Sequence, residues 1–147
     1  MSESVTLRYG WGFEAALPYG DITPETEVAF TRGHCHALAV ALHEATGWPI
    51  YEAYYDGHLP DPDEAGGHFA VKCPDGRIVD VMGAYTEDEE AFPGWGVATW
   101  VPSDIARIQW AVNWDGYRPL EDALDLARSL VPHVLRRAFG LDKQETT

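Results

Sequence analysis

Apolar residues recur at helical spacing over residues 35–46, where Leu38, Ala41 and Leu42 fall on one face. Gly47 ends this pattern and a proline follows two residues later, a combination typical of a helix C-terminus. The pattern therefore predicts a helix that begins near residue 35 and buries one side against the rest of the protein.

Period-two alternation follows on both sides of the turn sequence Pro74-Asp75-Gly76 and predicts a β-hairpin. A type I turn with glycine in the left-handed position makes a three-residue loop, which pairs Val71 with Val79. This register places His68 and Asp80 on one face as diagonal neighbours, about 7–8 Å apart between backbones. A two-residue loop would turn Asp80 to the opposite face, because side chains alternate along a strand.

Shorter patterns predict the remaining elements and a mixed α+β fold. A proline after Thr23 predicts a short helix, and Pro132 predicts a kink or two shorter helices within a C-terminal helix at residues 119–139. At 147 residues the chain is expected to form a single domain, residues 1–147. We expect polar loops at residues 56–67 and 86–96, and strands at residues 5–9, 50–55, 97–100 and 107–112.

The charge and the cysteine content exclude several classes of protein. The chain has 24 acidic and 10 basic residues, a formal net charge of −14, which argues against binding to a nucleic-acid backbone. No stretch is long and apolar enough to cross a bilayer, and the N-terminus lacks the pattern of a signal sequence. Two cysteines make no disulfide framework, so we expect a cytoplasmic protein without a membrane partner.

Acidic residues cluster at residues 56–64 and 87–90. One interpretation is two solvated loops that aid solubility. The other is a negative rim around a site, which would attract basic peptides or amines.

Cys35, His68 and Asp80 are the candidate catalytic residues. Cys35 falls in the first turn of the predicted helix, where unpaired N–H groups and the helix dipole favour a thiolate. His68 can supply the neighbouring base that a nucleophilic thiol requires. Most lone cysteines are small buried residues, and His68 alone could be a surface histidine at a strand start. The predicted proximity of His68 and Asp80 favours catalysis over these readings, because Asp is unfavourable in a strand unless it is paired.

A helix-borne cysteine followed by strand-borne histidine and aspartate resembles the papain-like and transglutaminase-like cysteine hydrolases. The nearest branches are NlpC/P60 and the bacterial transglutaminase-like proteins, and the resemblance is carried by residues 35–42, 68–71 and 75–83. It implies an α+β fold in which an N-terminal Cys-bearing helix packs on an antiparallel β-sheet, with a C-terminal helix. It also implies Cys35 as nucleophile, His68 as base, Asp80 as the group that orients His68, and no cofactor.

The chain departs from these families around the cysteine. Papain-type enzymes place a glutamine upstream that helps to hold the oxyanion, and no glutamine precedes Cys35 here. NlpC/P60 members usually show Asp-Cys-Ser or Asp-Cys-Gly, where this chain has His34-Cys35-His36. The backbone N–H of Cys35 is the first candidate oxyanion donor, and His36, Tyr9 and Tyr19 are candidates for the second.

Histidine and tryptophan residues suggest two further kinds of site. The histidines and cysteines show no C-x-x-C or H-x-x-x-H spacing, so we expect no metal ion. Trp48, Trp95 and Trp100 are candidates for the wall of a substrate groove, and core packing is the alternative.

Together these features predict a cysteine-dependent hydrolase or acyl transferase that acts on an amide or isopeptide bond. Its substrate would be a protein or peptide, and the catalytic residues alone do not separate a protease from a deamidase or a transamidase. The alternative is a non-catalytic acidic binding protein that antagonises a basic or nucleic-acid-binding partner. The sequence leaves the oligomeric state open.

Overall fold

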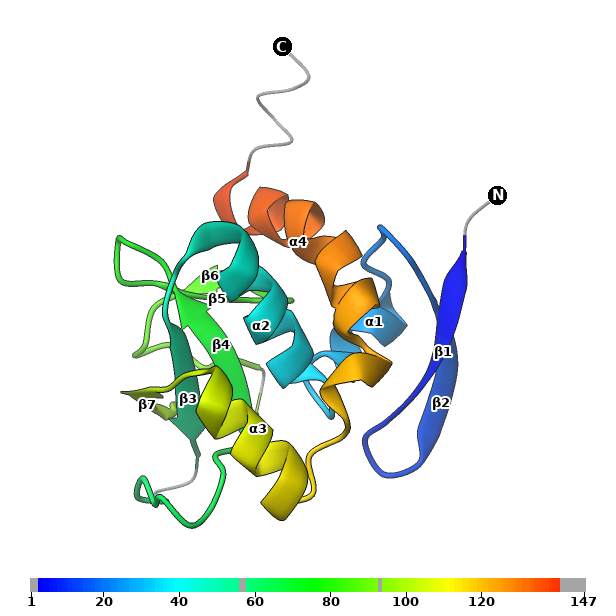
Figure 1. The fold of residues 1–147 in the computed structure, drawn as a ribbon. Coiled ribbons are helices and arrows are strands. Elements are labelled where there is room, and N and C mark those ends of the chain that lie inside the picture. Colours follow the sequence, from blue (N-terminus) through cyan, green and yellow to red (C-terminus); the bar gives the residue numbers. More distant parts are fainter. Residues whose placement is uncertain (1–2, 56–57, 93, 141–147) are drawn as a thin grey trace.

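The computed structural model describes residues 3–55, 58–92 and 94–140 and shows a mixed α+β fold (Figure 1). A five-stranded antiparallel sheet has the order β6-β5-β4-β3-β7, and a separate two-stranded sheet is formed by β1 and β2. The strands are β1 (Ser4–Tyr9), β2 (Phe13–Pro18), β3 (Ile50–Tyr54), β4 (His68–Lys72), β5 (Ile78–Asp80), β6 (Gly83–Tyr85) and β7 (Thr99–Pro102). The helices are α1 (Pro24–Ala29), α2 (Cys35–Thr46), α3 (Ile105–Trp114) and α4 (Leu124–Phe139), with a 3-10 turn at Leu120–Asp122.

The cysteine-bearing helix α2 is the centre of the molecule. It packs on β4 of the large sheet on one side and on α4 on the other, as Figure 1 shows. All residues from Cys35 to Leu42 are buried, as expected for a helix enclosed by neighbours on every side. Gly47 ends α2 in the left-handed conformation with φ +75°, as the sequence predicts.

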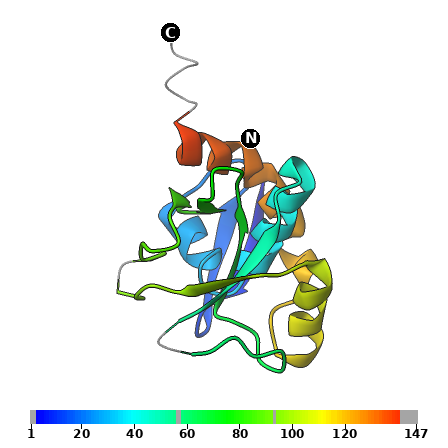
Figure 2. The ribbon, with the colours of Figure 1, turned by 90° about the vertical axis from the view of Figure 1, so that its left-hand side faces the viewer.

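The large sheet has two apolar faces. Phe69, Val71 and Val79 point from β4 and β5 into the core shared with α2 and α4. Ala70 and Ile78 belong to a second cluster on the opposite face of the sheet. Figure 2 views the molecule from the side on which the sheet lies. The segment between β6 and β7 covers this second cluster, so both faces of β4 are buried.

The β4–β5 hairpin has the register that its turn predicts. Val71 lies opposite Val79, and the N–H of Cys73 donates to the carbonyl of Arg77 over 2.9 Å. Gly76 adopts φ +92°, a conformation that favours glycine, so the three-residue loop is confirmed. His68 and Asp80 consequently share one face of the hairpin.

Two expected elements are wrong. Residues 107–112 form part of helix α3 and not a strand, because Asp104 caps the helix by accepting the N–H of Arg107 and because Ile108 and Ala111 are buried at helical spacing. Within 119–139 the alternative of two shorter helices divided at Pro132 is wrong: the break lies at Ala123, and α4 continues through Pro132, where burial of neighbouring residues on the α2 side holds the helix.

The other elements agree with the expectations to within a few residues. Thr23 caps α1, and its side chain accepts the N–H of Thr26. The strand expected at residues 97–100 begins two residues later, as β7. Asp56, at the start of the first acidic cluster, lies outside the described residues. Among the helices of the described ranges, none combines the length and the apolar character needed to cross a bilayer.

Candidate active site

The structure brings Cys35, His68 and Asp80 together from three elements. Cys35 is the first residue of α2, His68 the first of β4 and Asp80 the last of β5. His68 Nε2 lies 2.8 Å from Asp80 Oδ2, and both side chains are buried. Because Asp80 occupies Nε2, the ring nitrogen left for the Cys35 thiol is Nδ1, which has no other hydrogen-bond partner among the described residues.

The Asp80 carboxylate is held by three donors. Oδ2 accepts from His68 and, over 2.6 Å, from the hydroxyl of Tyr85, while Oδ1 accepts the N–H of Met82 over 2.8 Å. Burial and the negative charge of Asp80 raise the pKa of Tyr85, so its hydroxyl remains a donor. This arrangement fixes the direction of the carboxylate and therefore of the imidazole.

The electrostatics of the site favour an ion pair between Cys35 and His68. Burial opposes ionisation of the thiol, but the charge of His68 and hydrogen bonds from His36 and His68 outweigh it and lower the pKa of Cys35. Burial alone would lower the pKa of His68, whereas the Cys35 thiolate and the hydrogen bond to Asp80 raise it. The resulting thiolate and imidazolium are the forms that a nucleophilic cysteine needs near neutral pH.

Aromatic side chains enclose the His68 ring. Phe92 meets it edge-on at a centroid distance of 4.9 Å, and Trp100 does so at 6.1 Å. Trp100 is thus a neighbour of the histidine in the second core cluster. These rings keep bulk water from the His68–Asp80 contact, which strengthens the electrostatic interaction between them.

A groove of about 630 Å³ opens at Cys35, within the range of volumes typical of ligand sites. Five segments that are distant in the sequence form its walls. They are the turn between β1 and β2, the segment that leads into α2, the residues before β4, the segment between β6 and β7, and the segment between α3 and the 3-10 turn. Apart from Cys35, the lining residues are Gly10, Trp11, Thr31, Arg32, Gly33, Gly66, Gly67, Trp95, Asp115, Gly116, Tyr117 and Arg118.

Gly66 joins this groove to His68 and is fixed on both sides. Its N–H donates to Glu52 Oε2 over 2.7 Å, and its carbonyl accepts the hydroxyl of Tyr117. A Cβ on Gly66 would lie 2.3 Å from the carbonyl oxygen of Ala53, so no side chain fits without moving the backbone. The close approach of strand and groove wall therefore requires glycine at this position.

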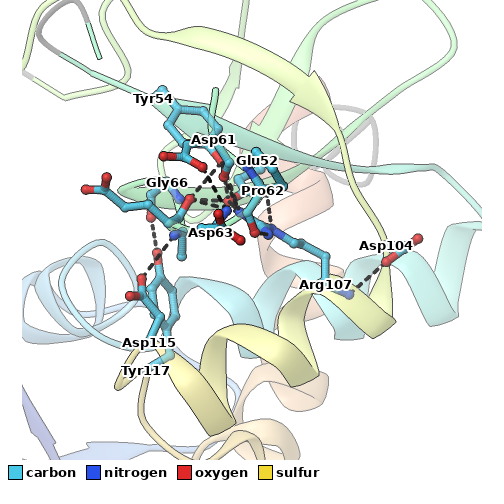
Figure 3. A network of polar contacts seen from close by, with 12 residues as sticks. Glu52, Tyr54, Asp61, Pro62, Asp63, Gly66, Asp104, Arg107, Asp115 and Tyr117 are labelled. Carbon is cyan, nitrogen blue, oxygen red and sulfur yellow. Dashed lines mark hydrogen bonds and ion pairs between the residues drawn. The ribbon is translucent and has the colours of Figure 1, made fainter. Parts of the chain in front are cut away.

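Arg107 anchors the loop that precedes Gly66, as Figure 3 shows. From α3 its Nε donates to Glu52 Oε1 over 3.1 Å, and its terminal nitrogens donate to the carbonyls of Asp61, Pro62 and Glu64. The ring of Trp110 lies 4.1 Å from the guanidinium carbon. This network is not evident from the sequence patterns, although Glu52 falls within a predicted strand, where a carboxylate that becomes buried requires a cation opposite it.

The other predicted site residues have different positions. Trp95 lines the groove. The prediction that Trp48 does so is wrong, since Trp48 follows the C-terminus of α2, about 18 Å from Cys35 along the helix axis, and packs on Phe139.

The candidate second oxyanion donors are not on the groove wall. His36 is fully buried, its Nε2 contacts the carbonyl of Arg118 at 2.8 Å, and its ring meets Tyr117 edge-on. Tyr9 stacks on Phe13 and Tyr19 packs against the main core, and neither lines the groove. The backbone N–H of Cys35, at the N-terminus of α2, remains the donor that the helix itself provides.

Comparisons of the chain with protein-family models, with curated proteins and with solved structures found no match. Among the described residues, no group of three or more His, Cys, Asp or Glu is arranged to hold a metal ion. One fold can carry unrelated functions, so a functional argument has to come from the geometry of a site. Here that geometry is a buried Cys–His–Asp arrangement beside a groove.

Proposed function

We propose that the protein is a cysteine-dependent hydrolase or acyl transferase that acts on an amide or isopeptide bond of a peptide or protein. The observation that carries this proposal is the contact between His68 and Asp80, which leaves Nδ1 of His68 for a thiol of lowered pKa. The groove at Cys35 gives an amide access to that thiol. The order of the elements that supply these residues supports a papain-like or transglutaminase-like core.

In the first half of the reaction the Cys35 thiolate attacks the carbonyl carbon and a C–S bond forms. The negative charge moves to the carbonyl oxygen, where the N–H of Cys35 stabilises it. Collapse of this intermediate breaks the C–N bond, and the His68 imidazolium gives its proton to the leaving nitrogen. The products are a free amine and a thioester on Cys35.

In the second half neutral His68 accepts a proton from the incoming acceptor. With water, a C–O bond forms, the C–S bond breaks and a carboxylic acid leaves. With an amine, a new C–N bond forms and the acyl group is transferred. Both routes return the thiolate and the imidazolium, with Asp80 holding the ring through Nε2 throughout.

The thiol chemistry also supports a location for the protein. Cys35 and Cys73 are both free, and a catalytic thiol acts only while it stays reduced. A reducing compartment such as the cytoplasm therefore suits the proposed function.

An acyl-transfer assay with p-nitrophenyl acetate tests the proposal without knowledge of the natural substrate. We expect a burst of p-nitrophenol and an acetyl group on the Cys35 peptide in mass spectra, because the acyl-enzyme forms before it is hydrolysed. The burst should be absent in Cys35→Ala and unchanged in Cys73→Ser. Added methylamine then separates transfer from hydrolysis, because transfer gives N-methylacetamide whereas hydrolysis by solvent water gives acetate.

Equal p-nitrophenol release from the native protein and from Cys35→Ala would contradict the proposal. Together with full retention of the biological effect by Cys35→Ala, that result would favour a non-catalytic acidic binding protein.

A further inference from the structure

The distribution of ion pairs distinguishes the groove from the rest of the surface. Although acidic residues outnumber basic ones by 24 to 10, Arg32 and Arg118 have no carboxylate partner among the described residues. Both of them line the groove at Cys35. Six other basic residues form ion pairs: Arg8 with Glu14, Lys72 with Glu87, Arg77 with Asp75, Arg107 with Glu52, Arg128 with Glu44, and Arg137 with Glu27.

Arg118 is held beside the start of α2. One of its terminal nitrogens donates to the carbonyl of Gly10 over 3.3 Å. A Cβ on Gly33 would lie 3.2 Å from Arg118 Nε, and Gly33 adopts φ +143°, so glycine here makes room for the guanidinium. Gly33 is two residues from Cys35, and both of these residues line the same groove as Arg118.

Arg32 is held on another wall of the groove. Its guanidinium carbon lies 5.7 Å from the centroid of the Trp95 ring. Trp95 packs edge-on against Phe92 at 5.3 Å, and Phe92 packs against His68. This aromatic chain places the guanidinium beside Trp95, and its planar N–H donors can make a bidentate contact with a carboxylate.

The acidic residue of the groove does not cancel these charges by pairing with them. Asp115 Oδ2 accepts the N–H of Ala65 over 3.0 Å and forms no ion pair with Arg32 or Arg118 among the described contacts. In a protein with a net charge of −14, two unpaired guanidinium groups in one groove create a local region that favours anions.

We propose that the groove selects substrates that carry a carboxylate near the amide bond under attack, with Arg32 and Arg118 as its binding residues. This inference rests on the proposed function and names the substrate class of the same site. It replaces the basic peptide or amine that the acidic loops suggest, because Arg32 and Arg118 line the groove at Cys35, whereas no described acidic residue of those two loops lines it. Arginine suits this role since its planar donors match a carboxylate.

A pair of alkylating reagents of similar size tests the inference. Iodoacetate is an anion and iodoacetamide is neutral, so the ratio of their reaction rates at Cys35 measures the effect of charge in the groove. We expect this ratio to exceed the ratio at Cys73 and to fall about fivefold in Arg32→Gln or Arg118→Gln. Arg128→Gln, which removes an exposed arginine that pairs with Glu44 and does not line the groove, should leave it unchanged.

Protection of the native protein provides a second measurement that needs no variant. N-acetylglutamate should slow the alkylation of Cys35 by iodoacetamide more than the neutral isostere N-acetylglutamine does, and added salt should weaken the difference. Equal protection by both compounds, or an unchanged reagent ratio in both groove variants, would overturn the inference. These outcomes leave rapid alkylation of Cys35 by iodoacetamide intact, whereas failure of the proposed function would remove it.

Discussion

The imidazole of His68 and the carboxylate of Asp80 meet across the β4–β5 hairpin, with Nε2 and Oδ2 2.8 Å apart and both side chains buried. Twelve positions separate the two residues in the chain, and the three-residue turn between their strands brings them onto one face. Because Asp80 binds Nε2 of His68, the ring nitrogen that is available to Cys35 is Nδ1.

Asp80→Asn should slow acylation of Cys35 by p-nitrophenyl acetate by about 10- to 100-fold. The amide keeps the size of the side chain but removes the negative charge that stabilises the imidazolium, and it can orient the ring wrongly. Burst kinetics measure the effect. Tyr85→Phe is the matched control, because it removes only one neutral donor from the same carboxylate and should cost less. An Asp80→Asn variant as fast as the native protein would remove Asp80 from the mechanism.

The acylation rate should follow a bell-shaped dependence on pH. The pKa of Cys35 is lowered, so the thiolate forms as the pH rises toward neutral; the pKa of His68 is raised, so its proton is lost only in the alkaline range. The reactive ion pair exists between these two limits. Stopped-flow measurement of the acylation rate across the pH range tests whether Cys35 ionises at a lower pH than His68 loses its proton. A single rise with a midpoint near the ordinary thiol value of about 8.5 would contradict it.

Gly66→Ala should lower both stability and acylation. The new Cβ would meet the carbonyl oxygen of Ala53 at 2.3 Å, so the backbone that leads into His68 has to shift. Gly67→Ala is the control, since its Cβ would meet only the ring of Tyr55 at 3.1 Å, and a side chain can move. Thermal melts and burst kinetics of the two variants should differ, with Gly66→Ala the more damaged. Equal melting temperatures and equal acylation rates in the two variants would show that the close approach of Gly66 to Ala53 has no role.

Arg107→Met should destabilise the protein by about 3 kcal/mol, because it leaves Glu52 buried without its cation. The carbonyls that Arg107 binds in the loop would also lose a donor. Urea unfolding measures the change. Arg128→Met, which removes an exposed ion pair with Glu44, should cost much less. Similar losses in both variants would mean that the loop does not depend on Arg107.

The hairpin and the helix around the candidate site could be predicted because their signals are local. Pro74-Asp75-Gly76 determines a loop length, and the loop length determines that His68 and Asp80 share a face. Gly47 likewise marks the end of α2 by its own conformational preference.

Helix α3 was predicted wrongly because a short alternation of Ile108, Trp110 and Val112 fits a strand. The helical signals were also present, in the cap at Asp104 and in the spacing of Ile108 and Ala111, and burial on one side of a helix decided the outcome. A run of six residues is too short for periodicity alone to separate the two structures.

The contacts that complete the site link residues far apart in the chain, and no local sequence pattern predicts them. Arg107 meets Glu52 across 55 positions, and Tyr117 meets Gly66 across 51. Arg32 and Arg118 become distinctive only when the ion pairs of the other basic residues are known. Such partners follow from tertiary packing, which the spacing of residues in the sequence does not specify.

Competition between the two cysteines for iodoacetamide tests the central claim most directly. Burial and the neighbouring Asp75 raise the pKa of Cys73, whereas His68 and His36 lower that of Cys35 against the effect of burial. At mildly acidic pH, peptide mass spectra should show Cys35 alkylated well before Cys73, and His68→Ala should abolish this preference. Alkylation of both cysteines at the same slow rate in the native protein would contradict an activated thiol at Cys35.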